Sequence, residues 1–159
     1  MHRKNNIRWL FVACTLLFFL SYLRESYFLT LNGVIHQQPI INSHVRLFYE
    51  LFSDLSVNTL VVMKWLSTVV FSIFFIGATL FFLHKYFSQM NYLKMVGYFY
   101  VGIFTVMLAI GLVGFLLGKY QQFYAPIRFL AGIIQSPILF FIAIPVFSFM
   151  GSVNKKQSR

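Results

Sequence analysis

The chain has 159 residues, of which 59% are hydrophobic and 10% are charged, whereas about 25% of the residues of ordinary soluble domains are charged. A soluble fold of this size cannot hide so much apolar surface. The formal net charge of +10 would suit nucleic-acid binding, but the basic residues are dispersed between apolar runs and form no compact basic domain. We therefore expect a membrane protein and no nucleic-acid partner.

The apolar residues come in long unbroken runs, which differ from the alternating segments of about ten residues that build membrane barrels. Backbone hydrogen bonds inside lipid must be satisfied within the protein, and helices do this. A spanning helix needs about 20 apolar residues. The sequence thus predicts one all-α, polytopic membrane domain with four transmembrane helices, at about 7–31, 60–83, 92–117 and 126–150.

The distribution of Lys and Arg predicts the orientation of these helices, because short cytoplasmic segments carry an excess of both residues. One side carries eight bases and no acid, namely Arg3, Lys4, Arg8, Lys85, Lys94, Lys155, Lys156 and Arg159. The other side carries the remaining five bases over longer segments, together with all three acids. We predict cytoplasmic termini in a bacterial inner membrane.

The only sizeable predicted connection is the outer segment 32–58. Its polar residues recur at three- and four-residue steps from Ser43 to Asn58, which is the period of an amphipathic helix. Ser43 suits the N-cap position. Such a helix would lie in the outer membrane interface or extend the second span outward.

The third and fourth spans carry features of close packing. Gly111, Gly114 and Gly118 lie on the third span, and the last two form a small-xxx-small step that allows close helix approach. They predict packing either within the chain or against another membrane protein or a second copy. The fourth span contains Gln135-Ser136-Pro137, a helix break that either serves packing or shapes a transport site.

Charged residues at the outer ends of the spans predict an anion site. Arg24, Glu25, Lys64 and Arg128 lie where charges must pair, snorkel or line a wet cavity, and Gln135 extends the polar surface inward from Arg128. Guanidinium groups bind phosphates and carboxylates bidentately. The alternative is that these side chains only snorkel toward lipid headgroups.

We predict no catalytic residue, no metal and no cofactor. His36, His44, Glu50 and Asp54 lie in the outer segment, but no HExxH-type element joins them, which favours a solvated face. The single Cys14 excludes an intramolecular disulfide and is remote from the outer histidines.

Seven residues in the first half of the chain resemble small four-helix membrane proteins of Bacteroidetes-type bacteria, some of which are encoded beside exosortase-like protein-sorting enzymes: Arg24, Glu25, Phe28, Asn32, Lys64, Trp65 and Thr68. The chain lacks the Cys/Arg/His constellation of an exosortase. The resemblance therefore implies an accessory protein and assigns no site.

These observations lead first to the hypothesis of a non-enzymatic accessory or assembly protein of the membrane. Its partners would be membrane lipids and another membrane protein or a second copy. The alternative is a membrane enzyme or transporter that handles an anionic, lipid-linked substrate at the outer leaflet. An anion channel is a third, weaker option, because four short spans form a pore only as an oligomer.

Overall fold

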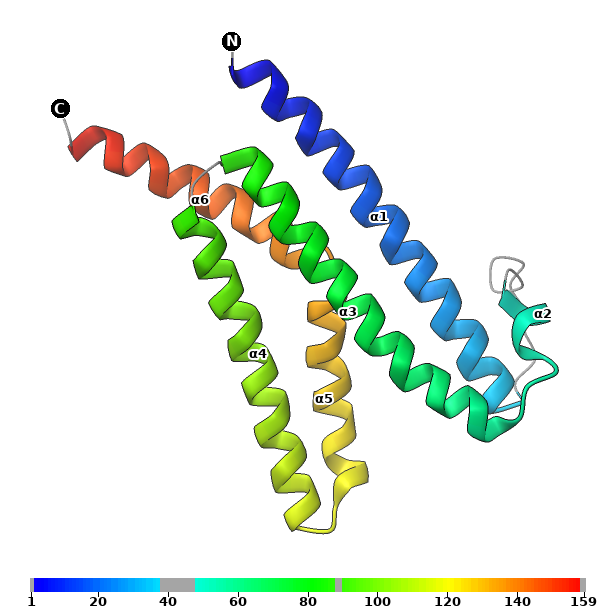
Figure 1. Ribbon diagram of the computed structural model, residues 1–159. Helices are drawn as coiled ribbons and strands as arrows, with labels where there is room; N and C mark the ends of the chain where they lie inside the picture. Colours follow the sequence, from blue (N-terminus) through cyan, green and yellow to red (C-terminus); the bar gives the residue numbers. More distant parts are fainter. Residues whose placement is uncertain (1, 38–47, 88–89, 158–159) are drawn as a thin grey trace.

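The computed structural model describes residues 2–37, 48–87 and 90–157 (Figure 1). The regular elements of these residues are helices: α1 (His2–Ile35), α2 (Tyr49–Phe52), α3 (Val57–Phe87), α4 (Met90–Leu116), α5 (Tyr120–Ile134) and α6 (Ile138–Gln157). Three of them, α1, α3 and α4, are long and apolar enough to cross a membrane, and the bent pair α5 and α6 makes a fourth candidate if it counts as one span. The predicted all-helical membrane class is confirmed, with three or four candidate spans.

The predicted fourth span is not one straight helix. It begins at Tyr120 instead of Pro126, and it breaks between Ile134 and Ile138, where the two helix axes differ by 57°. Pro137 explains the break, because it has no N–H to donate and its ring disfavours a helical conformation in the residue before it. Pro145 lies inside α6 without ending the helix.

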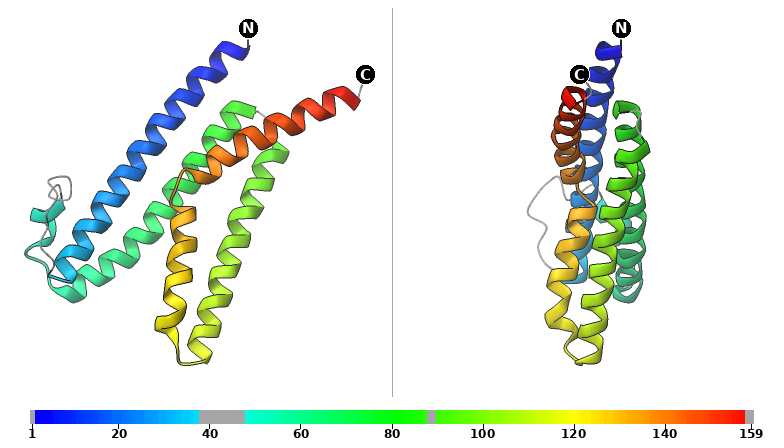
Figure 2. Two further views of the ribbon diagram at one scale, coloured as in Figure 1. Left: turned by 180° about the vertical axis from the view of Figure 1, so that it is seen from behind. Right: turned by 90° about the vertical axis from the view of Figure 1, so that its left-hand side faces the viewer.

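The long helices form two side-by-side pairs. α1 runs along α3, and α4 folds back on α5 as a hairpin (Figures 1 and 2). Both chain termini lie at the same end of the molecule, and the two pairs diverge toward the opposite end (Figure 1).

The main hydrophobic core holds the pairs together on the side of the termini. It is built from buried residues of α1, α3, α4, α5 and α6, with Phe75 and Phe140 fully enclosed and the rings of Tyr92 and Phe147 stacked at a centroid distance of 4.6 Å. The outward faces are also apolar, as in Phe115, which is 76% exposed. Lipid, and not water, suits such faces.

The predicted amphipathic helix 43–58 is wrong where the structure describes it, and residues 43–47 lie outside the described residues. Helix α2 ends at Phe52, and Asn58 already belongs to α3. Ser53 donates from its hydroxyl to the Glu50 carbonyl, and the Ser56 hydroxyl accepts the N–H of Thr59. These side chains satisfy backbone groups locally, which ends one helix and starts another.

The three glycines that the sequence singled out, Gly111, Gly114 and Gly118, have two different roles. A methyl group at Gly114 would lie 2.9 Å from Phe123 Cβ on α5, and one at Gly111 would meet Ile127 at 3.7 Å. Gly118 instead ends α4 with a positive φ of 64°. Its N–H bonds to the Phe115 carbonyl and that of Lys119 to the Gly114 carbonyl, the pattern of a Schellman cap. Gly111 and Gly114 thus pack within the chain.

We expect Gly114→Ala to destabilise the α4–α5 hairpin. The added methyl group overlaps Phe123 Cβ, which belongs to the stem of the side chain and has little room to move, so the free energy of unfolding should fall by about 1–3 kcal/mol. Thermal unfolding in dodecyl maltoside measures the change. The control is Gly102→Ala, because open space surrounds Gly102 and alanine favours helix by up to about 1 kcal/mol. Equal effects of the two substitutions would contradict the packing assignment.

Candidate basic cavity

A cavity of about 360 Å³ lies between α1, α3 and α5, on the side where the helix pairs diverge. Its lining combines three basic side chains with polar, aromatic and aliphatic ones. The lining residues are Arg24, Glu25, Phe28, Leu29, Asn32, Lys64, Trp65, Thr68, Met107, Tyr124, Ile127, Arg128, Ala131 and Gln135. All five residues that the sequence predicted for an anion site belong to this set.

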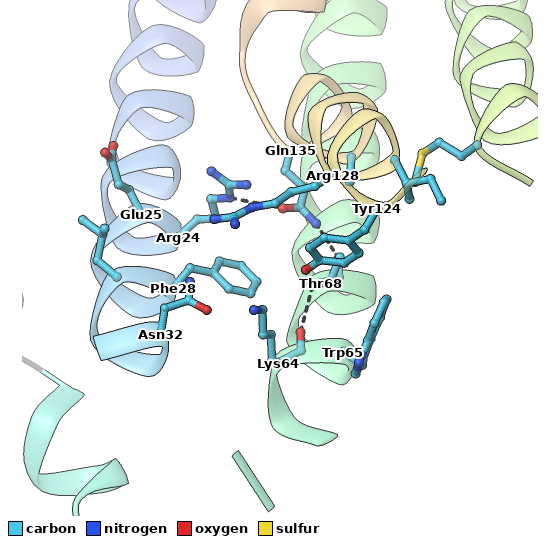
Figure 3. A pocket seen from close by; sticks show the side chains of 14 residues that line it. Arg24, Glu25, Phe28, Asn32, Lys64, Trp65, Thr68, Tyr124, Arg128 and Gln135 are labelled. Carbon is cyan, nitrogen blue, oxygen red and sulfur yellow. Dashed lines mark hydrogen bonds between the residues drawn. The ribbon is translucent and has the colours of Figure 1, made fainter. Parts of the chain in front are cut away.

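The basic side chains enter the cavity from three different helices (Figure 3). Arg24 of α1 and Arg128 of α5 reach toward each other, and the Lys64 ammonium group points into the same space from α3. Glu25 lies at the rim, and its carboxylate points away from the three cations. The anion site that the sequence predicted therefore has three converging bases and one acid, and the charge of that acid acts on Arg24 and not on Lys64.

Gln135 holds the three helices together at the break between α5 and α6. Its side-chain oxygen accepts a hydrogen bond from Arg24 Nε at 3.1 Å. Its amide nitrogen donates to the Thr68 carbonyl at 2.7 Å and to Ser72 Oγ at 2.9 Å. Gln135 is 2% exposed, so this buried amide has both its oxygen and its nitrogen paired, as buried polar groups require.

Apart from Arg24 Nε, the basic groups of the cavity have no acceptor among the described residues. Lys64 and Arg128 form no hydrogen bond or ion pair with them, and Arg24 uses only Nε. The charge of Arg128 acts repulsively on both Arg24 and Lys64, whereas the charge of Glu25 attracts Arg24 more strongly than Arg128 repels it. Three like charges next to apolar helices are unfavourable unless water or an anion screens them. The geometry thus favours an anionic occupant.

Aromatic rings line the space beside these charges. The Arg24 guanidinium lies 5.4 Å from the centroid of the Phe28 ring, a cation–π distance. Trp65 and Tyr124 meet edge to face at a centroid distance of 6.4 Å, and Trp65 is 51% exposed. The cavity therefore offers charged groups to the polar part of a ligand and apolar surface to hydrocarbon attached to that part.

Asn32 adds an unsatisfied acceptor to the cavity. Its side-chain oxygen is buried and has no hydrogen-bond partner, and Figure 3 shows the side chain facing the space near Lys64. A buried acceptor without a partner costs about 1–3 kcal/mol. A ligand hydroxyl or a water molecule at this position would satisfy it.

Helix lengths place the cavity near a membrane boundary. Lys85 lies close to Trp9, 6.0 Å from the ring centroid, and this pair suits one boundary. Lys64 precedes Lys85 by about 20 residues, or about 30 Å of helix, which equals the thickness of the hydrocarbon core. In a membrane of this thickness that the helices cross upright, Lys64 would lie at the opposite boundary, and Arg24, about 16 residues after Arg8, would lie roughly 6 Å inside it.

The sequence did not single out Phe28, Asn32, Trp65, Thr68 or Tyr124 as site residues. The first four belong to the set that resembles the Bacteroidetes-type proteins, and all seven residues of that set line the cavity. Their spacing explains why: positions 24, 28 and 32 share one face of α1, as do 64 and 68 on α3 and 124, 128, 131 and 135 on α5. The sequence signal that could have indicated them is the recurrence of polar residues on one face of each of three helices.

The residues weighed for metal or acid–base chemistry lie elsewhere. His36, Glu50 and Asp54 are exposed outside the cavity, and His44 lies outside the described residues. Within the described ranges, no group of three or more His, Cys, Asp or Glu side chains is placed to hold a metal ion. Cys14 packs against the main core.

We expect Gln135→Leu to loosen the cavity by removing three hydrogen bonds while keeping a side chain of similar size. Interhelical hydrogen bonds in membrane proteins contribute about 0.6 kcal/mol each on average, so the free energy of unfolding should fall by about 1–2 kcal/mol. Thermal unfolding in dodecyl maltoside tests this. Gln122→Leu, at an exposed position in the first turn of α5, should have little effect, and equal losses would rule out the bridging role of Gln135.

Comparison with known proteins gives no assignment for this cavity. No family model, no curated protein and no solved structure matches the chain. The resemblance to small Bacteroidetes-type membrane proteins stays a prediction. Inferences about function therefore start from the geometry of the cavity.

Proposed function

We propose that this protein binds a phosphate-bearing membrane lipid through the basic cavity. The observation that supports the proposal is the convergence of Arg24, Lys64 and Arg128, from three helices, on one cavity whose lining includes a single carboxylate, that of Glu25 at the rim. Snorkelling side chains would point separately to the membrane surface. Here all three side chains line one cavity.

The charge and donor pattern favours phosphate over a carboxylate. Three positive groups surround the cavity, and a phosphomonoester or diphosphate brings more than one negative charge and several acceptor oxygens. Arg24 keeps its terminal nitrogens available because only Nε bonds to Gln135. A single carboxylate would leave most of these donors and charges unmatched.

The walls of the cavity favour a lipid over free phosphate. Leu29, Ile127 and Ala131 provide aliphatic surface next to the bases, and Phe28 and Trp65 provide aromatic surface. Free inorganic phosphate has no carbon to contact these walls. A lipid headgroup carries the phosphate and adjoining apolar atoms, and a headgroup hydroxyl would also satisfy Asn32.

The topology that accompanies this proposal has four spans and cytoplasmic termini in a bacterial inner membrane. Two observations support it: both termini lie at one end of the molecule, and the bases without acids concentrate in the segments at that end. The bent pair α5 and α6 then forms the fourth crossing. The basic cavity opens in the outer leaflet.

The accessory-protein hypothesis remains compatible with lipid binding but loses two of its supports. Gly111 and Gly114 pack against α5 and so do not form a free docking face, and the outer helix does not continue past Phe52. An accessory role would then consist of holding a lipid or lipid-linked compound for a partner. We keep enzyme activity and transport as alternatives for the same ligand.

The intrinsic fluorescence of Trp65 offers a direct test. Trp9→Phe leaves Trp65 as the single tryptophan, at the wall of the cavity. In dodecyl maltoside, dioleoyl phosphatidic acid should change its emission saturably, and dioleoylglycerol, which has the same chains without phosphate, should not. Lys64→Gln and Arg128→Gln should each weaken binding about tenfold or more, because hydrogen bonds to charged groups contribute about 1.5–3 kcal/mol.

Lys119→Gln is the matched control, because Lys119 is an exposed base in the α4–α5 turn and does not line the cavity. It should bind phosphatidic acid like the parent protein. Equal responses to phosphatidic acid and dioleoylglycerol would refute phosphate recognition. Unchanged binding by both Lys64→Gln and Arg128→Gln would do the same.

A further inference from the structure

A shallow groove lies next to the basic cavity along α5. It has a volume of about 480 Å³ and is lined by Ala125, Arg128, Phe129, Gly132, Ile133 and Ile138. Arg128 is the only charged member of this lining, and it also lines the basic cavity. The groove and the cavity therefore meet at one side chain.

The chemistry of the groove differs sharply from that of the cavity. Apart from Arg128, every lining residue is apolar or glycine, and Phe129 is 70% exposed. The groove follows α5 from Ala125 to Ile133, about 8 residues or roughly 12 Å of helix, and it reaches Ile138 beyond the break. It thus runs beside the basic cavity along the same length of α5, toward the end of the molecule where the termini lie.

Gly132 keeps the middle of the groove open. A methyl group at this position would meet no atom within 4 Å, so glycine is not required here for packing inside the chain. The bend of 57° between α5 and α6 lies just beyond it, with Ile133 and Ile138 on its two sides. A larger side chain at position 132 would fill the groove and would leave the protein core unchanged.

We propose that the groove holds a hydrocarbon chain of the same lipid whose phosphate occupies the basic cavity. This inference rests on the proposed function and adds the ligand class: an amphiphile with a phosphate headgroup and a chain that lies along α5. The continuity of the two surfaces at Arg128 supports it, because phosphate bound there places its ester oxygen at the entrance of the groove. Burial of the chain against Phe129 and Ile133 gains affinity in proportion to the apolar area covered.

The test compares two probes on the single-tryptophan protein in dodecyl maltoside: dioleoyl phosphatidic acid and glycerol 3-phosphate, which shares the headgroup but has no chain. Gly132→Leu should weaken the binding of phosphatidic acid about tenfold. It should leave the titration with glycerol 3-phosphate unchanged, because position 132 does not line the basic cavity. Phe129→Ala, which removes an exposed ring from the groove, should weaken phosphatidic acid selectively in the same way.

The matched control is Gly102→Leu, which places the same side chain in open space on α4 and should bind both probes like the parent. Two results would overturn the groove assignment: phosphatidic acid binding that survives both Gly132→Leu and Phe129→Ala, or an equal loss of both probes. Failure of the proposed function looks different, because then neither probe changes Trp65 emission in the parent protein. Thermal unfolding of each variant verifies that the fold is retained.

Discussion

The side chain of Gln135 satisfies the constraint that governs this fold, which is that polar groups among membrane helices need partners within the protein. The break between α5 and α6 places this amide between two other helices, where it accepts a hydrogen bond from Arg24 of α1 and donates to Thr68 and Ser72 of α3. The core near the termini fixes the other half of the molecule. Gln135 joins all three walls of the basic cavity by hydrogen bonds, and the Tyr27–Ser67 hydrogen bond adds a second link between α1 and α3.

The same arrangement explains why the cavity is suited to a ligand. Gln135 positions the Arg24 guanidinium, and helices α3 and α5 add Lys64 and Arg128 without any acid between them. Mutual repulsion of these charges destabilises the folded state, and a bound anion would offset this repulsion by attracting each of the bases. Stability and ligand recognition are therefore coupled in one group of side chains, as is common at sites where strain is retained for function.

The sequence was sufficient to predict the helical membrane class, because long apolar runs permit few other structures. It also identified Arg24, Lys64, Arg128 and Gln135, since charges at such depth are expensive. The direction of the Glu25 carboxylate could not be predicted, because it depends on side-chain rotation and not on spacing. The sequence failed for α2, where Ser53 and Ser56 form local hydrogen bonds that override the amphipathic period. The separate roles of Gly114 and Gly118 required knowledge of where α4 ends.

The hydrogen bond between Arg24 and Gln135 joins residues that are 111 positions apart, so it links α1 with a segment that is synthesised much later. While the chain is being inserted, α1 has to hold its guanidinium near the membrane boundary before its partner exists. A charge in a lone helix is tolerated there mainly by snorkelling. The native position of Arg24 is thus reached late in biosynthesis, and completion of the C-terminal helices is the event that closes the cavity.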